Sequence, residues 1–500
     1  MQRLPSLLLV EERLDPARDT LGAAGHLRLT LPGALTQALL TRVPAAFHGG
    51  IDDVLLTGLA LAVADWCRRK PHRVSDDAVM QAHPVRGASH AVLLDLEGHG
   101  REEAFGREEG LGRADAPGDI DLTRTVGWFT SLYPVRLDPG ALDLDEALAG
   151  GPALGHALKI VKEQLRAVPG KGLGYGLLRY LNADTASALS GTPAPQLGFN
   201  YLGRFAAGDS GADWSPAAMA AGAPHEARPD VQPGGGDAAM PMAHAIEIDA
   251  LTLDGADGPV LTANWRFAPA LLDEAAVRDL AESWFRALSA LVRHASRPGA
   301  GGRSPSDLPL VDLTQTEIER LESEAAGRGQ GGQVLEDILP LSPLQEGLLF
   351  HALYDAQGPD VYTVQLELEL EGRLDSAVLE ASLQAVVGRH ASLRSGFLHE
   401  HLSQPVQVVL TRVAVPWRLI DLSGLDAGEQ QWRLADIIDD DRRERFDLAA
   451  PPLMRFALIK LAAERHRLLI SNHHLPLRLD RRCASNTRSH QERPAYYRCR

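Results

Sequence analysis

The sequence contains few of the residues that build disulfide frameworks and zinc sites. Its 500 residues include three cysteines, Cys67, Cys483 and Cys499. They are too few and too scattered for a disulfide framework or a zinc site. We therefore expect no metal, and a reducing cytoplasm is the expected setting.

Long apolar runs and a basic excess are also missing. No run of 18 apolar residues is present, so no membrane span is expected. The net charge of −16 argues against nucleic acid or an anionic membrane as the main partner, because both attract basic patches. Residues 1–12 lack a strongly basic start and a small-residue cleavage site, which indicates a strand or linker rather than a signal peptide.

What remains is an ordinary globular composition, with 45% hydrophobic and 23% charged residues. The length predicts several domains. Residues 51–66 have apolar side chains around much of a helix, which predicts a buried helix. Residues 362–372 alternate like a strand, and residues 246–267 resemble a hairpin. Helices and strands are mixed in both halves, which predicts an α/β fold class.

Two polar stretches divide the chain. Residues 295–307 and 325–334 are rich in Gly, Arg and Ser and low in hydrophobicity, which is typical of a linker. The more apolar residues 309–324 lie between them and could dock as a strap and short helix.

The first candidate for chemistry is EGHGRE at residues 97–102. An apolar strand brings Glu97 to a turn with two glycines, and burial there would raise the pKa of its carboxyl group, as a general acid or base requires. The alternative is a strand-end turn with a solvated glutamate.

Other candidates lie at 124–137 and 199–203. Arg124 stands beside aromatic residues. It could be a cation that binds a ligand, or simply a charged residue that flanks a core strand. Asn200 and Tyr201 are adjacent on a predicted strand, so at most one should point into a given cleft unless the strand kinks. The glycine-rich residues 170–181 lack the order of a nucleotide-binding loop, which excludes that reading.

His473 and His474 close an apolar strand. Adjacent strand residues diverge and no third ligand is near, which argues against a metal site. One of them could act as a base, and an ordinary core or surface histidine is the alternative.

Together these stretches resemble nonribosomal peptide synthetases. Residues 20–325 resemble the C-terminal lobe of an epimerization domain, through VPAAFHGGIDDVLLTGLALAVADW, LEGHGREE, DLTRTVGWFTSLYPVRL, KEQLRAVPGKGLGYGLLRYL and FNYLGRF. Residues 335–474 resemble the N-terminal lobe of a condensation domain, through ILPLSPLQEGLLFHALYD, VVGRHASLRSGF, RFDLAAPPLMRFALIKL and LLISNHH.

The resemblance implies two-layer α/β sandwich lobes like chloramphenicol acetyltransferase. It predicts an epimerization lobe at 1–297, a linker at 298–334, a truncated condensation lobe at 335–474 and an out-of-frame or disordered tail at 475–500.

The resemblance also implies a function. Carrier protein domains and other synthetase modules would be the partners, presenting aminoacyl or peptidyl thioesters on phosphopantetheine, with no cofactor bound directly. Glu97 would be one of two acid/base groups in L-to-D epimerization at Cα, with Arg124, Asn200 and Tyr201 around it. His474, preceded by His473, would deprotonate or orient the amine that condenses with the D-configured donor.

Three departures from the family pattern lead to further expectations. Arg478 and Leu479 stand where HHxxxDG requires Asp and Gly. Residues 103–120 are expected to form a longer loop than is usual in the family, and the N-terminal lobe of the epimerization domain, with its HHxxxD motif, is expected to be absent. Residues 475–500 carry seven arginines against two acids, as out-of-frame translation would give, with a divergent native tail as the alternative.

We therefore expect little or no catalysis from this chain alone, and no racemisation of a carrier-bound amino acid. One alternative is a non-catalytic module that binds carrier proteins. Another is a pairing of the two lobes that places Glu97 near His474.

Overall fold

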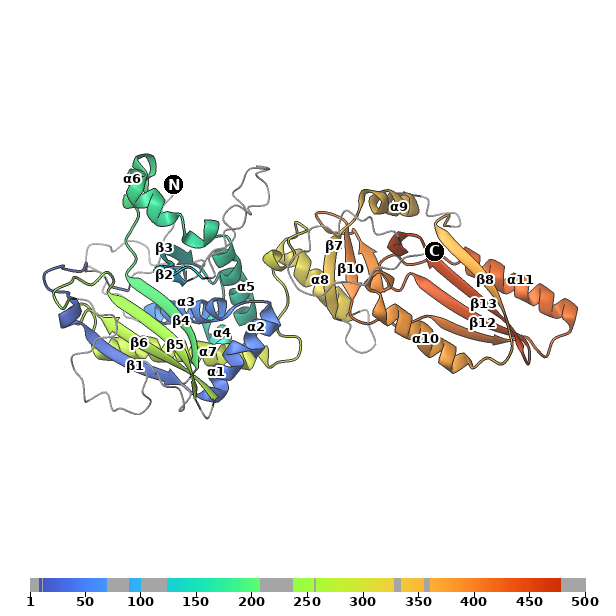
Figure 1. Ribbon diagram of the computed structural model, residues 1–500, viewed down its shortest axis with the longest axis horizontal. Coiled ribbons are helices and arrows are strands. Elements are labelled where there is room, and N and C mark those ends of the chain that lie inside the picture. Colours follow the sequence, from blue (N-terminus) through green and yellow to red (C-terminus); the bar gives the residue numbers. More distant parts are fainter. Residues whose placement is uncertain are drawn as a thin grey trace, which may run out of the picture. The chain divides into compact units, whose positions relative to one another are not determined.

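The computed structural model describes residues 9–10, 12–69, 90–99, 124–206, 237–255, 258–327, 334–354 and 360–477. They belong to two compact units, Met1–Gly302 and Arg303–Arg500 (Figure 1), called unit 1 and unit 2. Each unit is described by itself. The predicted loop at 103–120 and the departures at Arg478 and Leu479 lie outside the described residues.

Unit 1 is built on one mixed sheet of six strands in the order β1-β6-β5-β4-β2-β3. The strands are β1 (Gly25–Leu31), β2 (Val92–His99), β3 (Thr130–Leu137), β4 (Leu197–Ala206), β5 (Ile246–Gly255) and β6 (Gly258–Phe267). β5 and β6 form the antiparallel hairpin expected from the sequence, whereas β4 lies parallel to both β2 and β5.

Alternation along each strand gives the sheet one apolar and one polar face. Leu27, Leu94, Phe199, Ile248 and Ala263 face the helices and share one core cluster with them. The intervening side chains point the other way, because successive strand residues alternate. We call this second side the open face of the sheet.

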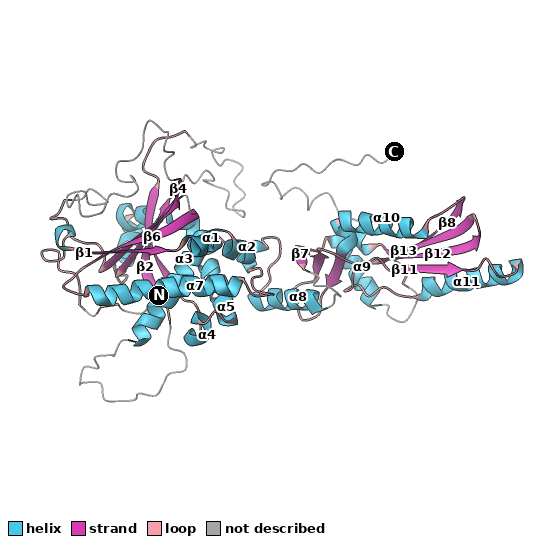
Figure 2. Cartoon of the chain, turned by 90° about the horizontal axis from the view of Figure 1, so that it is seen from below, coloured by secondary structure: helices cyan, strands magenta, loops and turns pink. Residues whose placement is uncertain are grey.

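Helices supply the rest of the unit 1 core (Figure 2). They are α1 (Gly33–Leu40), α2 (Arg42–Phe47), α3 (Ile51–Arg69), α4 (Leu144–Leu148), α5 (Pro152–Arg166) and α7 (Glu274–Ala295). A further helix, α6 (Ala183–Ser190), has no buried residue and adds nothing to this core. The helix expected at 51–66 is α3, which is buried along nearly its whole length. Trp284 of α7 donates from its indole nitrogen to the carbonyl of Leu55 on α3 at 3.0 Å, so the indole joins the two helices inside the core.

Residues 33–47 form two short helices with a break between them. α1 ends at Leu40 and α2 begins at Arg42, with Thr41 outside helical geometry between them. Pro44 explains the break, because it has no N–H for a continuing helix but is tolerated in the first turn of a new one.

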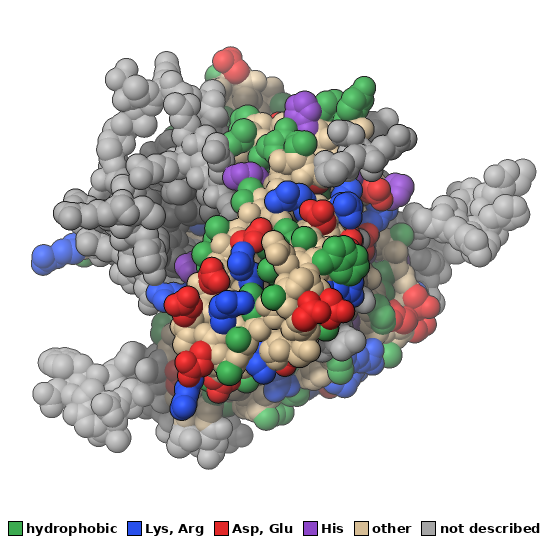
Figure 3. Space-filling model, turned by 90° about the vertical axis from the view of Figure 1, so that its right-hand side faces the viewer, with side chains coloured by type: hydrophobic (Ala, Val, Ile, Leu, Met, Phe, Trp, Pro, Cys, Tyr) green, Lys and Arg blue, Asp and Glu red, His purple; other side chains and the backbone are tan. Residues whose placement is uncertain are grey.

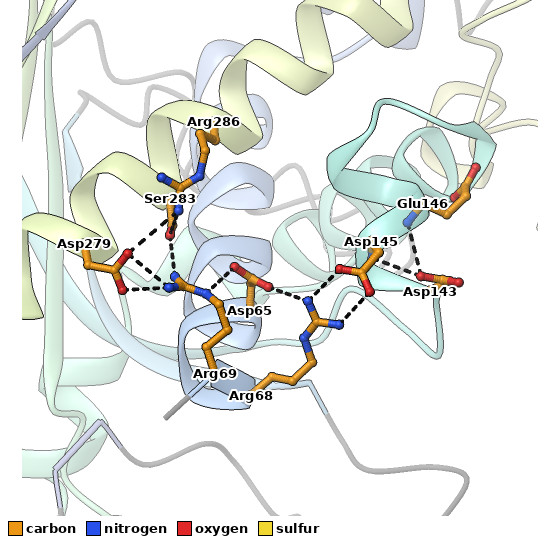
Figure 4. A network of polar contacts seen from close by, with 9 residues as sticks. All are labelled: Asp65, Arg68, Arg69, Asp143, Asp145, Glu146, Asp279, Ser283 and Arg286. Atoms are coloured by element: carbon orange, nitrogen blue, oxygen red, sulfur yellow. Dashed lines mark hydrogen bonds and ion pairs between the residues drawn. The ribbon is translucent and has the colours of Figure 1, made fainter. Parts of the chain in front are cut away.

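The C-terminal end of α3 is tied to its neighbours by ion pairs (Figure 4). Asp65 receives hydrogen bonds from Arg68 and Arg69. Arg68 continues to Asp145 on α4, and Arg69 continues to Asp279 on α7. The buried Asp65 carboxylate thus lies at the centre of a network that links three helices.

The N-terminus of α7 offers a test of local stability. Asp273 caps the helix by accepting from the backbone N–H of Ala276 at 2.7 Å. Asp273→Ala should lower the free energy of unfolding of unit 1 by about 1 kcal/mol, measured by urea unfolding. Asp273→Asn should stay close to wild type because asparagine also caps. Equal losses in both variants would contradict the capping role.

Unit 2 contains two smaller sheets, of order β7-β10-β9 and β11-β12-β13-β8. The strands are β7 (Leu335–Pro340), β8 (Thr363–Glu371), β9 (Ser395–Leu398), β10 (Val406–Leu410), β11 (Trp417–Asp421), β12 (Met454–Ala462) and β13 (Arg465–His473). The helices are α8 (Gln315–Gly327), α9 (Pro343–Tyr354), α10 (Ser376–Arg389) and α11 (Ala427–Arg443). Figure 2 shows the four-stranded sheet between α10 and α11.

Part of the segment predicted as a linker packs into unit 2. Leu313, Ile318 and Leu321 are buried in one cluster with Ile338 and Val408 of the three-stranded sheet. The α8 helix therefore corresponds to the short helix expected within 309–324. The domain limits at 297, 334 and 474 stay predictions.

The predicted α/β fold class is confirmed for both units: the unit 1 sheet is mixed, and unit 2 has one antiparallel and one mixed sheet. Among the described helices, none is by itself long and apolar enough to cross a membrane. One pair of helices, Gly33–Phe47 and Ile51–Arg69, has the length and composition of a membrane span when taken together, but the two are bent by 98° relative to each other. The face in Figure 3 carries acidic and basic side chains interspersed with hydrophobic ones.

Candidate functional site

A groove of about 550 Å³ lies on the open face of the unit 1 sheet. It is lined by His26, Glu97, Gly127, Trp128, Phe129, Thr130, Asn200, Leu202, Asp249, Leu251, Asn264, Trp265 and Arg266. These residues come from all six strands and from the segment that leads into β3. The groove combines polar groups that can orient a ligand with aromatic side chains at its edge, as ligand sites commonly do.

Four polar residues cross the groove in one row. The strand register places Glu97 of β2 beside Asn200 of β4, Asn200 beside Asp249 of β5, and Asp249 beside Asn264 of β6. Neighbouring strands lie about 4.8 Å apart, so the four side chains project into one space. We call these residues the polar row.

Asp249 is held within this row by two neighbours. The Asn200 side chain hydrogen bonds to its carboxyl group, and Nη2 of Arg266 lies 3.6 Å from its Oδ2. Burial raises the pKa of Asp249, while Arg266 and the Asn200 hydrogen bond act in the opposite direction. The carboxyl group is nevertheless accessible from the groove, with 34% of its side chain exposed.

The structure separates Asn200 from Tyr201, as the strand alternation predicted. Tyr201 packs against the helix side of the sheet, and its hydroxyl lies 2.9 Å from the Thr252 hydroxyl. Arg124 is exposed in a turn before β3 and is not among the groove-lining residues. Glu97 and Asn200 are thus brought together, whereas the proposed roles of Tyr201 and Arg124 stay predictions.

A second row, one step along the strands, contains residues that sequence reasoning missed. His244 lies across Gly198 of β4, with Nε2 2.9 Å from Asp95 of β2 and Nδ1 3.4 Å from Glu247 of β5. Both ring nitrogens therefore face carboxylates, as an imidazolium requires. We call Asp95, His244 and Glu247 the His244 clamp, because it joins β2 to β5 over β4.

The two carboxylates of the clamp raise the pKa of His244. Burial by itself would lower the pKa of His244, but hydrogen bonds to Asp95 and Glu247 outweigh burial and raise it to about 9. Arg266 pairs with Glu247 at 3.1 Å as well as with Asp249. The clamp thus connects electrostatically to the polar row through one shared arginine.

Gly198 is required where the imidazole crosses the strand. A Cβ atom at this position would lie 2.8 Å from Nδ1 of His244, closer than van der Waals contact. Gly198→Ala should therefore lower the unfolding free energy by about 1–3 kcal/mol and bring the pKa of His244, followed by NMR, toward its ordinary value. Gly174→Ala, where the added Cβ meets no atom within 4 Å, is the matched control. Equal behaviour of the two variants would contradict this role.

In unit 2, the two adjacent histidines have different environments. His473 is fully buried; its Nδ1 accepts from the backbone N–H of Leu475 at 3.1 Å, so Nε2 carries the proton toward Asp360 at 3.1 Å. Burial lowers the pKa of His473, and Asp360 opposes this effect. His473 is therefore a neutral, fixed residue of the core.

His474 is the more accessible of the pair. Its backbone N–H donates to Tyr362 at 2.9 Å, which anchors the end of β13, and its side chain is partly exposed. Adjacent strand residues diverge, as expected. Of the two, His474 is the one with solvent access for proton transfer.

Gln345 supports this region, and sequence reasoning did not single it out. Its buried side chain donates to the carbonyl of Leu475 at 3.3 Å and to Gln407 at 3.2 Å. Gln345 belongs to the SPLQEG stretch at the start of α9. The stretch was recognisable as a motif, but a contact across 130 residues could not be read from it.

Glu97 belongs to unit 1 and the histidine pair to unit 2. The hypothesis that a pairing of lobes brings Glu97 near His474 stays a prediction. Each site on its own offers one candidate acid/base group with a positioned polar neighbour.

Comparison with known proteins links both units to peptide synthetases. Residues 335–477 match the family model of the condensation domain. One of the proteins that make up the linear gramicidin synthase of Brevibacillus parabrevis is 35% identical over 462 residues, which cover 92% of this chain and 8% of that protein. Bacitracin synthase 3 of Bacillus licheniformis is 29% identical over 451 residues, covering 90% of this chain and 6% of that protein.

Among solved structures, the epimerization domain from the third module of tyrocidine synthetase B is similar. It is 27% identical, with a TM-score of 0.40, and the match covers 59% of this chain and 53% of that one. The chain spans less than a tenth of the length of the gramicidin and bacitracin synthases. The chain is thus similar, over most of its length, to proteins of the linear gramicidin and bacitracin synthases, and its residues 335–477 match the condensation domain.

Proposed function

We propose that the chain is part of a nonribosomal peptide synthetase and that it handles aminoacyl or peptidyl groups carried as phosphopantetheine thioesters. Unit 1 would take part in L-to-D epimerization at Cα. Unit 2 would take part in condensing the D-configured donor with an L-configured acceptor. Carrier protein domains and other synthetase modules would be the partners, and the few cysteines fit the proposed cytoplasmic setting.

The single observation that carries the proposal is the placement of Glu97 beside Asn200 in the groove. These residues come from EGHGRE and FNYLG, which belong to two of the five stretches that carry the resemblance to epimerization domains. A carboxylate on the groove wall can accept the α-proton of a thioester, whose electron pair then moves into the carbonyl as an enolate. A proton returned from the other face would invert the centre.

For unit 2 the proposal rests on His474, a partly exposed residue directly after β13. A neutral imidazole there can accept a proton from an attacking amine. The fixed His473 and the Gln345 contact to Leu475 hold the backbone on both sides of His474. Arg478, which stands where the family pattern has an aspartate, is the reason to expect weak or no condensation by this chain.

The test uses Cα proton exchange, because removal of the proton needs only one base. The full chain is incubated in D₂O with L-aminoacyl pantetheine thioesters that carry small, branched or aromatic side chains. We expect deuterium to enter at Cα above the spontaneous rate while the L configuration is retained. Exchange at the spontaneous rate for every thioester would rule out a catalytic role for unit 1. Net conversion to the D form would contradict the expectation that this chain alone does not racemise its substrate.

A second candidate function is a non-catalytic module that binds carrier proteins. It is favoured by Val126 and Trp128, which are 97% and 88% exposed beside the groove and could contact a docked partner. Binding of a phosphopantetheinylated carrier protein without any exchange would select this function over the catalytic one.

A further inference from the structure

The polar row contains a carboxylate that the proposed proton transfer does not use. Asp249 lines the same groove as Glu97, two strands away, with Asn200 between them. At about 4.8 Å per strand, the two backbone positions lie about 10 Å apart. Side chains that rise from one sheet face at that distance leave room between them for a tetrahedral carbon and its substituents.

The charges around Asp249 are unbalanced. Within the part of the chain that the structure describes, Asp95, Glu247 and Asp249 rise from β2 and β5 on the open face and share two cations. The two cations among them are each already shared: His244 faces Asp95 and Glu247, and Arg266 lies 3.1 Å from Glu247 and 3.6 Å from Asp249. The next described cation along the row is Arg28 of β1, which lies beyond Asn264.

Arg266 contacts two carboxylates, Glu247 and Asp249, and Asp249 has the weaker contacts of the two. Its contact with Arg266 is the longer one, and the neutral Asn200 amide supplies its other described contact. It is also the more accessible of the two, because 34% of its side chain is exposed against 20% for Glu247. A partly buried carboxylate that is accessible from a groove favours a cationic group on the ligand.

We propose that Asp249, oriented by Asn200, binds a cationic nitrogen of the carrier-bound substrate while Glu97 faces its Cα. This inference rests on the proposed function. The nitrogen has two possible sources: the α-ammonium of an aminoacyl thioester, or a basic side chain of an aminoacyl or peptidyl thioester. An α-ammonium held in its charged form would also make the adjacent Cα–H more acidic, which would help Glu97 remove that proton.

The experiment measures binding of three pantetheine amides to the full chain by calorimetry. The amide replaces the thioester so that the probe resists hydrolysis. L-Leucyl pantetheine amide carries an α-ammonium, N-acetyl-L-lysyl pantetheine amide carries a side-chain ammonium, and N-acetyl-L-leucyl pantetheine amide carries no positive charge. We expect at least one cationic probe to bind about tenfold or more tightly than the neutral one, the size of one charge-assisted hydrogen bond.

Variants test whether Asp249 is responsible. Asp249→Asn keeps the shape and should reduce the preference for a cation to less than about twofold. Glu274→Gln, which removes an exposed carboxylate from α7, should leave the preference unchanged. Hydrogen exchange of β5 peptides establishes that the Asp249 variant is folded.

The possible outcomes are distinct. Preference for the leucyl probe identifies the α-ammonium, and preference for the lysyl probe identifies a side chain. Equal binding of all three probes to the wild-type chain, or a preference that survives in Asp249→Asn, would overturn the inference and leave the proposed function standing. No binding of any probe would remove the proposed function and the inference together.

Discussion

Glu97→Gln should lower the rate of Cα deuterium exchange about 100-fold or more, to the spontaneous rate of the thioester. General-base catalysis by a positioned carboxylate contributes about 10²–10⁴-fold, and the glutamine amide cannot accept the proton. The variant preserves the length of the side chain and its place beside Asn200 in the groove. The change in rate should therefore come from chemistry rather than from repacking.

The measurement is deuterium incorporation by mass spectrometry over time, for wild type and variant under the same conditions. Glu274→Gln is the control, because it removes a carboxylate from the exposed face of α7 and should keep the wild-type rate. Binding of the pantetheine amides should stay within a few-fold of wild type in Glu97→Gln. A variant that binds normally and still exchanges at the wild-type rate would show that Glu97 is not the base.

This experiment depends on a placement that the sequence predicted only in part. The apolar run before EGHGRE predicted that β2 would bring Glu97 to a strand end, and alternation predicted that Asn200 and Tyr201 would face opposite sides. The pairing of β2 with β4 could not be predicted, because these strands are joined by a long crossover whose described part includes β3, α4, α5 and α6. Local patterns define strands, but the order of strands depends on contacts distant in sequence.

The His244 clamp shows the same limit more sharply. Its histidine and Asp95 lie 149 residues apart in sequence, and the glycine beneath the imidazole is an ordinary residue within a strand pattern. A lone histidine before an apolar strand carries no signal of this arrangement. The need for glycine at position 198 becomes evident only when the sheet order is known, because that order places β4 between β2 and β5.

In unit 2 the prediction from sequence was closer to the structure. Divergence of adjacent strand residues predicted different environments for His473 and His474, and the structure buries the first and exposes part of the second. The partner of His473 was not predictable, since Asp360 lies 113 residues earlier, just before β8. The motif residues were recognisable, whereas the residues that hold them were not.

The His244 clamp should make the stability of unit 1 depend on pH above neutrality. The pKa of His244 is about 9 in the folded chain and about 6.5 when unfolded. A raised pKa means that the folded state holds the proton more tightly, so the stabilisation is fully present below about pH 6.5 and is lost as pH rises through 9. The shift corresponds to about 3 kcal/mol of unfolding free energy across this window.

Comparison with His244→Gln isolates this effect, because glutamine can hydrogen bond to Asp95 or Glu247 but cannot carry the charge. Urea unfolding of unit 1 at pH 6, 7.5 and 9 should show the wild-type chain losing about 3 kcal/mol more than the variant between the extremes. His156→Gln, at an exposed position on α5, should follow wild type. Parallel pH profiles for wild type and His244→Gln would mean that His244 has the same pKa in the folded and the unfolded chain, which would contradict the clamp.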